Sequence, residues 1–245
     1  MAICRFCFQE KKLIKAHVIP RCLLEPLKAG GTITRYSGER GILPARVPTG
    51  DYDTTILCGS CDSSFSAWED YTADLLHKIV PHLPIFSARR ISVAHDFKYP
   101  DLKLCILSVL WKMSVSKREP FKHIELGPHE KIIHRMLQSR DPGAQSEFPI
   151  LVSRFTDTLG MLTMWGPERI KIHGLNVLTI GLPGYRMYIK VDRRPLSPGV
   201  LHNCLAPDKP LVILLDRMDI GRPYERIKFV YQNADLSLGL RKKSR

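Results

Sequence analysis

The chain has 245 residues, of which 44% are hydrophobic and 25% are charged, a balance that predicts a folded protein rather than a disordered one. This length fits one large domain or two small ones. No apolar run approaches the roughly 18 residues that a membrane helix needs. The first residues also lack the apolar stretch of a secretory signal, so we expect a cytoplasmic protein.

The charge of the chain is strongly positive. Lys and Arg number 37 against 24 Asp and Glu, a net charge of +13. The surplus is greatest in residues 183–245, which contain 13 basic and 6 acidic residues. A field of this sign attracts polyanions, and nucleic acid is the commonest of these in a cytoplasm. We therefore expect nucleic acid as the partner, although a basic protein without such a ligand stays an alternative.

Four of the seven cysteines form two pairs with C-x2-C spacing, Cys4 with Cys7 and Cys58 with Cys61. Two residues between cysteines let both thiolates face one ion, and two such pairs complete a tetrahedral sulphur site for Zn²⁺. A disulfide is not expected where thiols are kept reduced. The spacing therefore predicts a structural zinc ion held by these four side chains.

The segment between the two cysteine pairs is too long for a compact zinc ribbon. It contains Lys15-Ala-His-Val-Ile-Pro20, followed by a polar, glycine-rich stretch from Ala29 to Asp53. Asp62 directly follows the second pair, and apolar residues at helical spacing predict an amphipathic helix over residues 66–80.

This arrangement in residues 1–80 resembles the HNH endonucleases, the zinc-knuckle branch of the ββα-metal nucleases. The resemblance implies a zinc-bound ββα-metal module of treble-clef type that hydrolyses phosphodiester bonds, in DNA more than in RNA. It makes His17 the general base that activates water, Asp53 the group that orients the imidazole, and Asp62 a ligand of a catalytic Mg²⁺ or Mn²⁺. A role in phage defence or in a mobile element is compatible with such an enzyme.

One position departs from the family pattern. Active members usually carry a metal-binding residue immediately before the base histidine, and here that residue is Ala16. Glu69 and Asp70 are the nearest replacements in sequence. The alternative is a catalytically decayed, zinc-stabilised module that binds nucleic acid or protein.

Two of the proposed site residues also have simpler explanations. His17 fits a buried histidine at the end of a strand, and Asp62 fits an N-cap of the following helix, a role that aspartate fills well.

Beyond residue 90 the pattern changes. Pro100 and Asp101 predict the start of an apolar helix that reaches Val115, and Pro128 predicts the start of a second helix that ends before Asp141. Strands are then expected over the following ranges: 148–155, 159–165, 175–180, 185–191, 210–215 and 228–231.

These elements predict an α+β protein in which the N-terminal module is followed by a helical segment and a mostly antiparallel sheet. We expect two domains, 1–90 with the nuclease module and 91–245 as a basic α+β domain for specificity or partner binding. Three segments also look like a group of uncharacterised bacterial proteins, a similarity that brings no assigned chemistry: Leu107-Ser-Val-Leu-Trp111, Leu126-Gly-Pro-His-Glu130 and Asp141-Pro-Gly143.

Overall fold

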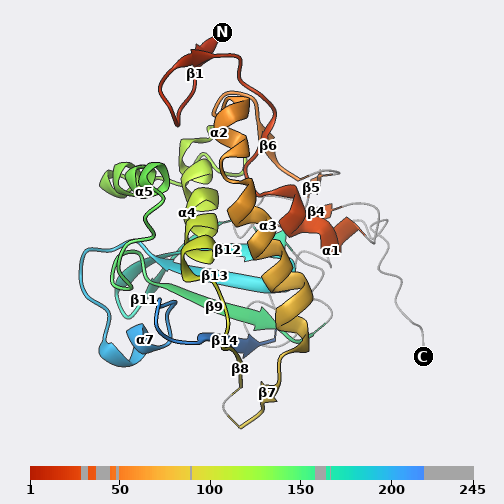
Figure 1. The fold of residues 1–245 in the computed structure, drawn as a ribbon, viewed down its shortest axis with the longest axis vertical. Coiled ribbons are helices and arrows are strands. Elements are labelled where there is room, and N and C mark those ends of the chain that lie inside the picture. The colour runs from red at the N-terminus through yellow and green to blue at the C-terminus, as the bar shows by residue number, and fades with distance from the viewer. Residues whose placement is uncertain are drawn as a thin grey trace.

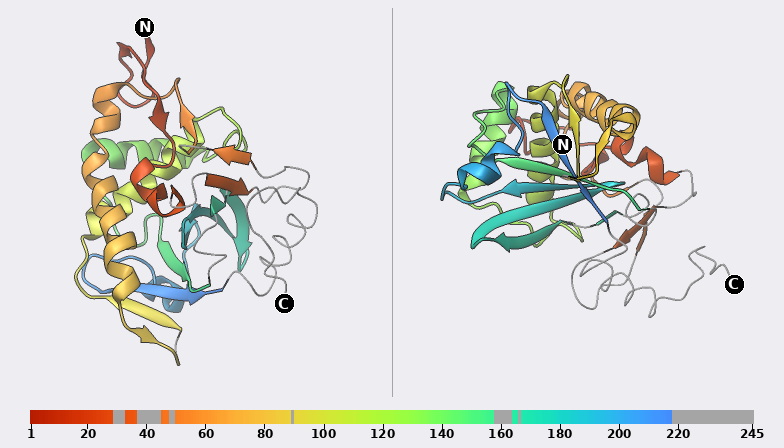
Figure 2. Two further views of the ribbon diagram at one scale, coloured as in Figure 1. Left: turned by 90° about the vertical axis from the view of Figure 1, so that its right-hand side faces the viewer. Right: turned by 90° about the horizontal axis from the view of Figure 1, so that it is seen from below.

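The structure is a computed structural model of the chain, and it describes residues 1–28, 33–36, 45–47, 50–88, 90–157, 164–165 and 167–217. Figure 1 shows a large sheet with helices over one of its faces, and Figure 2 shows the same two layers from the side and from below. A smaller N-terminal part, which contains the cysteine pairs, lies at one end of the helices. None of the helices in this described part is long and apolar enough to cross a membrane.

The main sheet has seven strands in the order β11-β12-β13-β9-β14-β8-β7. All neighbouring strands are antiparallel except β14 and β9, which are parallel. In this order the strands are β11 (Glu168–Ile172), β12 (Leu175–Leu182), β13 (Tyr185–Lys190), β9 (Ile150–Phe155), β14 (Leu211–Asp216), β8 (Ile91–Ala94) and β7 (Ile85–Phe86).

Two-residue turns join three consecutive strands of this sheet. Gly174 and Gly184 take backbone φ angles of 77° and 78°, a left-handed region that glycine reaches without a steric penalty. In the first turn His173 also has a positive φ, 49°, as in the type I′ turns that match the twist of paired strands, whereas in the second Pro183 keeps a negative φ before Gly184. The two turns connect β11 to β12 and β12 to β13, which makes this half of the sheet a simple meander.

Three longer helices cover one face of the sheet. They are α3 (Ser66–Asp74), α4 (Tyr99–Val115) and α5 (Pro128–Ser139), and a short helix, α7 (Pro198–His202), lies beside the sheet at one end. The predicted helix over 66–80 is confirmed, although its last part continues as a π-helical turn (Leu75–Ile79) and a 3₁₀ turn (Val80–His82). The predicted helix ending at Val115 is also confirmed, and every residue from Leu102 to Met113 is buried.

The N-terminal part consists of short elements. Two strand pairs are antiparallel, β1 (Ala2–Ile3) with β2 (Glu10–Lys11) and β3 (Ala16–His17) with β6 (Tyr52–Asp53). Strand β4 (Ile33–Tyr36) lies between β5 (Ala45–Val47) and β10 (Met164–Trp165). The short helices are η1 (Arg21–Leu24), α1 (Glu25–Lys28) and α2 (Gly59–Ser63).

One hydrophobic cluster joins the N-terminal part to the rest of the chain. It includes Phe6, Leu57 and Phe65 together with Trp111 of α4 and Ile189 of β13. The expected boundary between 1–90 and 91–245 falls between β7 and β8, which pair with each other. The two parts therefore share a core and a sheet, and their division into separate domains stays a prediction.

The architecture confirms a mixed α/β protein with a mostly antiparallel sheet. Strands predicted over 148–155, 175–180, 185–191 and 210–215 match β9, β12, β13 and β14 within two residues at each end. The sequence did not predict β7, β8 or β11. The strand expected at 228–231 and most of the one expected at 159–165 lie outside the described residues.

Candidate metal centre and adjoining polar site

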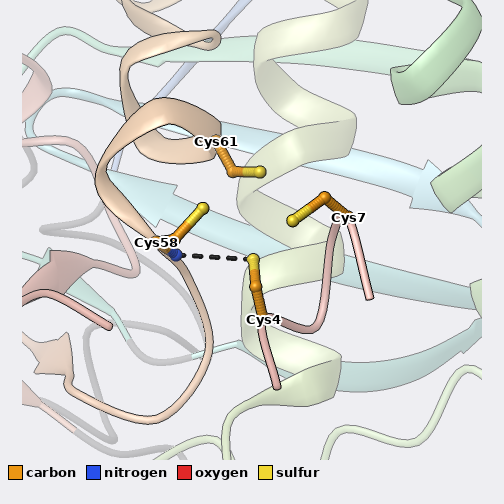
Figure 3. A group of neighbouring side chains, drawn as sticks. All are labelled: Cys4, Cys7, Cys58 and Cys61. Carbon is orange, nitrogen blue, oxygen red and sulfur yellow. Dashed lines mark hydrogen bonds between the residues drawn. The ribbon is translucent and has the colours of Figure 1, made fainter. Parts of the chain in front are cut away.

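The first cysteine pair lies in a tight turn between β1 and β2. The Cys4 amide donates to the Gln9 carbonyl at 3.0 Å, and the Phe8 amide donates to the Cys4 carbonyl at 2.9 Å. Phe8 accommodates this turn with a φ of 56°. The turn brings the side chains of Cys4 and Cys7 to the same side of the chain (Figure 3).

The second cysteine pair lies at the start of α2. Cys58 immediately precedes this helix, and Cys61 lies within it. The two pairs are held together by backbone contacts, since the Cys58 amide donates to Cys4 Sγ at 3.4 Å and the Arg5 amide donates to the Ile56 carbonyl at 2.8 Å. All four sulphur atoms lie within 4.8 Å of one another (Figure 3).

The arrangement of the four thiols suits the binding of a metal ion such as zinc. Burial opposes ionisation of Cys58, but hydrogen bonds from Ser60 and Cys61 outweigh it and lower the pKa of Cys58 to about 6. Burial and the neighbouring cysteines raise the pKa of Cys61. Thiolates crowded in this way repel one another, and a divalent cation with tetrahedral sulphur coordination removes that repulsion.

The first cysteine turn is also anchored to the second half of the chain. Phe6 packs edge-on against Phe65 and Trp111, at centroid distances of 5.0 and 5.4 Å. Its carbonyl is 2.8 Å from His134 Nε2 and accepts a hydrogen bond from Gln138 Nε2 at 3.0 Å. The cysteine cluster therefore rests on α4 and α5.

His17 lies at the end of β3 and is half-buried. It is the partner of Tyr52 across the strand pair, with ring centroids 6.4 Å apart. Gly50 passes close to it with a φ of 85°, and a Cβ atom there would lie 2.6 Å from Leu24 Cδ1 and 3.9 Å from His17 Cδ2. A glycine is therefore needed where the chain turns beside the imidazole.

Asp53 is the partner of Ala16 in the same strand pair and is only 1% exposed. Its Oδ1 accepts from the Thr55 amide and hydroxyl, each at 2.7 Å, and its Oδ2 accepts from the Ser116 hydroxyl at 2.7 Å. Successive side chains of a strand point to opposite faces, so Asp53 lies on the other face of the pair from Tyr52 and His17. This arrangement favours a structural role for Asp53.

The ionisation of Asp53 reflects the same contacts. Burial would raise its pKa, but the hydrogen bonds from Ser116 and Thr55, with the charge of Arg118, hold the pKa below its usual value. The carboxylate therefore fastens β6 to the C-terminal end of α4 in its charged form.

Asp62 lies in α2, where its amide donates to the Cys58 carbonyl at 3.0 Å. It is not an N-cap, because neither α2 nor α3 has a side-chain hydrogen bond at its N-cap. Burial raises the pKa of Asp62, and the charges of Lys112 and His17 act in the opposite direction while Glu69 reinforces the rise. The fold therefore brings His17 and Asp62 within electrostatic reach of each other.

Glu69 and Lys112 form an ion pair beside Asp62. Lys112 Nζ is 2.8 Å from Glu69 Oε1, and the two side chains are 1% and 16% exposed. The ammonium also lies 5.5 Å from the centroid of the Phe65 ring. The buried Lys112 of α4 thus neutralises the charge of Glu69 from α3. The position of Lys112 in the sequence does not reveal this contact.

A preformed site for a catalytic divalent ion does not fit these residues. Within the part of the chain that the structure describes, the four cysteines are the one group of three or more potential ligands that converge. Ala16 offers no ligand and is fully buried, Asp53 is held by Thr55 and Ser116, and Glu69 is paired with Lys112. Ala16, Asp53 and Glu69 are thus unsuited to bind the ion, and Asp62 remains as the carboxylate near His17.

Two exposed cations, Lys15 and Arg118, lie over the ring of Tyr52. Lys15 Nζ lies 4.3 Å from the centroid of the Tyr52 ring, and the Arg118 guanidinium carbon lies 5.5 Å from it. Tyr52 is the cross-strand partner of His17, so both cations lie next to the residue that pairs with His17. The proximity of Arg118 follows from packing between segments far apart in sequence.

Replacing one cysteine of the cluster tests the metal centre. We expect the wild type and Cys22→Ser, which alters a cysteine outside the cluster, to hold about one zinc ion per chain, and Cys61→Ser to hold much less. The melting temperature of Cys61→Ser should fall because the cluster joins the two ends of a long loop. Elemental analysis and thermal denaturation measure the two effects, and equal zinc in all three proteins would contradict the assignment.

The buried carboxylate of Asp53 predicts an acid-sensitive contribution to stability. Because its pKa lies below the usual 3.8 when the chain is folded, this contribution is complete above about pH 4 and is lost as the pH falls through the folded pKa. Asp53→Ala should lower the free energy of unfolding at pH 7 by about 2 kcal/mol, whereas Asp96→Ala, at an exposed site, should change little. Urea denaturation at pH 7 and pH 3 measures both, and a loss for Asp53→Ala no greater than that for Asp96→Ala would rule out the anchoring role.

Comparisons with known proteins add no assignment to this geometry. No family model, no curated protein and no solved structure matches the chain. The resemblance to HNH endonucleases therefore rests on the residues of the cysteine cluster and of the His17 site.

Proposed function

We propose that this protein is an HNH-type nuclease that hydrolyses phosphodiester bonds of nucleic acid, with DNA as the preferred polymer. The observation that carries the proposal is the pairing of His17 and Asp62. One lies at the end of a strand and the other in α2, directly after Cys61, and the charge of His17 favours the ionised form of Asp62. A coupled histidine and carboxylate suit general base catalysis near neutral pH.

The order of the elements supports this proposal. Strands β3 and β6 form an antiparallel pair, and α2 and α3 follow directly after them. The cysteine cluster fastens the start of this unit to the start of α2. A strand pair followed by a helix, stabilised by zinc on four cysteines, is the arrangement that the HNH resemblance implies.

The proposed reaction uses groups of this chain. His17 takes a proton from a water molecule whose oxygen attacks phosphorus, a new P–O bond forms, and the bond to the leaving sugar oxygen breaks. The leaving oxygen then takes a proton from solvent. Ionised Asp62 stabilises the imidazolium that forms on His17, in the way that a carboxylate supports a catalytic histidine elsewhere.

Lys15 and Arg118 supply positive charge next to the proposed base. Both are exposed and flank Tyr52. A phosphate held between them would lie beside His17, and its negative charge would be partly neutralised before attack. Lys112 is buried and serves as a positioning residue, because it fixes Glu69 and favours the charged form of Asp62.

A cleavage assay with a His17 variant tests the proposed function. We expect His17→Ala to nick supercoiled plasmid at least about a hundredfold more slowly than the wild type. His95→Ala, which alters an exposed histidine away from the site, should cut normally. Zinc content and melting temperature should be similar in all three proteins, so that a loss of cutting reports the chemistry.

The same assay decides what kind of cation the reaction uses. It is run with plasmid, single-stranded DNA and RNA, in Mg²⁺, in Mn²⁺ and in EDTA. Cutting that persists in EDTA would assign charge neutralisation to Lys15 and Arg118, and cutting that needs Mg²⁺ or Mn²⁺ would mean that Asp62 and the substrate phosphate recruit the ion together. Equal cutting by the wild type and His17→Ala would show that His17 is not the base.

A second candidate function is binding of nucleic acid without turnover. The residues at the positions expected to bind a catalytic metal ion favour this function, because Ala16 is buried and Glu69 is neutralised by Lys112. The proposed contacts of Lys15 and Arg118 with phosphate would persist in such a protein.

The salt dependence of DNA binding tests the phosphate contacts of Lys15 and Arg118 independently of catalysis. Replacing Lys15 and Arg118 together by Gln should weaken binding of a DNA duplex and reduce the slope of log K against log salt by about 2, because each phosphate contact releases about one counterion. His17→Ala should bind the duplex nearly as the wild type does. Fluorescence anisotropy at several salt concentrations measures the slopes, and an unchanged slope in the double variant would exclude this surface as the phosphate contact.

A further inference from the structure

A large cavity lies on the face of the sheet away from α4. Its volume is about 1010 Å³, at the upper end of the range for small-molecule sites. Residues of β9, β12, β13 and β14 form its floor, and the segment 194–204, which includes α7, forms one wall. The cavity is separate from the His17 site, none of whose residues line it.

The alternation of the strands explains the floor of this cavity. Ile150 and Val152 of β9 point into the core, whereas Leu151 lies on the opposite face and lines the cavity. Across the strand pair, Leu151 is the partner of Tyr188, which also lines it. Aliphatic residues give the cavity an apolar surface, among them Leu151, Leu175, Val177, Leu196, Val200 and Leu214.

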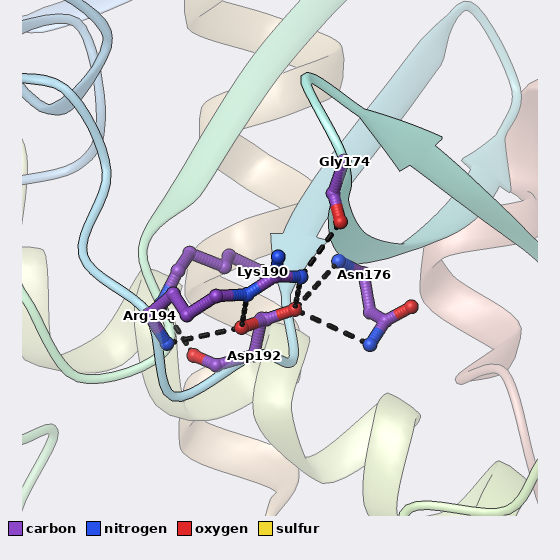
Figure 4. A network of polar contacts seen from close by, with 5 residues as sticks. All are labelled: Gly174, Asn176, Lys190, Asp192 and Arg194. Carbon is purple, nitrogen blue, oxygen red and sulfur yellow. Dashed lines mark hydrogen bonds and ion pairs between the residues drawn. The ribbon is translucent and has the colours of Figure 1, made fainter.

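One end of the cavity carries two fixed cations, Lys190 and Arg194 (Figure 4). The carboxylate of Asp192 holds Arg194, with Nε 3.0 Å from Oδ1 and Nη2 2.7 Å from Oδ2. Arg194 Nη2 also donates to the Gly174 carbonyl at 2.6 Å. These contacts leave Nη1 of Arg194 outside the network formed by the described residues.

The rest of this network positions Asp192 and Lys190. Asp192 Oδ2 accepts from the Asn176 amide at 3.0 Å and from the Asn176 side chain at 3.2 Å, and Lys190 Nζ donates to the Asp192 carbonyl. Asp192 does not line the cavity. Two cations and one carboxylate leave a net positive charge at this end of an apolar chamber.

The wall carries two further charged residues, one of each sign. Arg90 is exposed and lines the cavity together with the half-buried carboxylate of Asp216. Asp216 is the one acidic residue among the described residues of the wall, and its Oδ1 accepts from the Arg217 amide at 2.8 Å. The lining therefore has a positive balance and an apolar floor.

We propose that this cavity binds an organic anion, with a carboxylate or phosphate head at Lys190 and Arg194 and an apolar body on the sheet floor. A charged head in contact with two fixed cations makes charge-assisted hydrogen bonds. An apolar body removes Leu151, Val177 and Leu214 from water. An amphipathic anion such as a fatty acid matches both surfaces, and this binding activity goes beyond the proposed nuclease reaction.

The test is calorimetric titration of the full chain with three amphiphiles of equal chain length. Dodecanoate and dodecyl phosphate are the anionic probes, and dodecyltrimethylammonium is the cationic one, each kept below its critical micelle concentration. We expect at least one anion to saturate a single site and the cation not to bind there. A preference between the two anions would identify the head group.

Variants locate the site within the cavity. Arg194→Gln should weaken binding of the anion about tenfold, whereas Arg193→Gln, which alters an adjacent exposed arginine outside the lining, should not. Leu151→Trp, which fills the floor, should abolish binding while thermal denaturation shows a folded chain. His17→Ala should bind as the wild type does, which separates this proposal from the proposed nuclease function.

Three results would overturn the proposal: no saturable binding of either anion, equal binding of the cationic amphiphile, or equal weakening by Arg193→Gln and Arg194→Gln. The last result would mean that the anion is attracted by the general positive charge of the chain. Unchanged binding in Leu151→Trp would likewise place the anion elsewhere.

Discussion

The convergence of four cysteine sulphurs is the constraint on which the N-terminal half depends. It joins residues 4–7 to residues 58–61 and closes a loop of about fifty residues, whose ordering carries an entropic cost. The backbone contacts between the two cysteine pairs are few, so much of this closure rests on the sulphur cluster. Once the loop is closed, β3 and β6 meet, and His17 is brought toward Asp62. A metal ion such as zinc in this cluster would therefore shape the His17 site without touching a substrate.

Helix α4 extends this dependence to the second half of the chain. Lys112, one of its two buried lysines, pairs with Glu69, and Ser116, just after the end of the helix, donates a hydrogen bond to Asp53. Both contacts support residues near His17 with groups that lie outside the N-terminal part. Breaking a buried ion pair leaves an uncompensated charge, which makes such pairs sensitive to loss of one partner. The proposed site is thus built on a scaffold that spans both halves, which explains why one core serves the whole described structure.

The sequence was most informative where a signal is local. The spacing of the two cysteine pairs predicted the cluster, and the long apolar run after Pro100 predicted α4, because each pattern depends on neighbouring residues. Contacts over long separations were not predictable in this way. Ser116 lies 63 residues from Asp53, and Lys112 lies 43 residues from Glu69. Their pairing follows from how α4 packs. It changed the interpretation of Asp53, which the HNH resemblance assigns to orient the imidazole, and of Glu69, the nearest replacement in sequence for the missing metal ligand.

Short strands were missed for a related reason. β7 has two residues, Ile85 and Phe86, each 51% exposed, so the alternation that marks a half-buried strand is absent. The neighbouring strand β8 buries Ser92 and Ala94 and leaves Ile91 and Val93 half-exposed, so its pairing with β14 and β7 does not follow from the position of its apolar residues. The sequence did not predict the cavity with Lys190 and Arg194, because its floor comes from four strands and Arg194 is held both by Asp192 and by the Gly174 carbonyl of a distant turn.

The position of β14 has a consequence for how the molecule is completed during synthesis. This strand comes late in the described chain, yet it lies between β9 and β8, pairing in parallel with one and antiparallel with the other. Until residues 211–216 leave the ribosome, the β7–β8 hairpin and the β9–β13 meander each expose an unpaired edge. A nascent chain that stalls before this point would expose the unpaired edges of two incomplete sheets, and these edges could pair with strands of other chains. β14 thus closes the central gap of the sheet, and termination before residue 211 would be more damaging than in a fold built outward from its N-terminus.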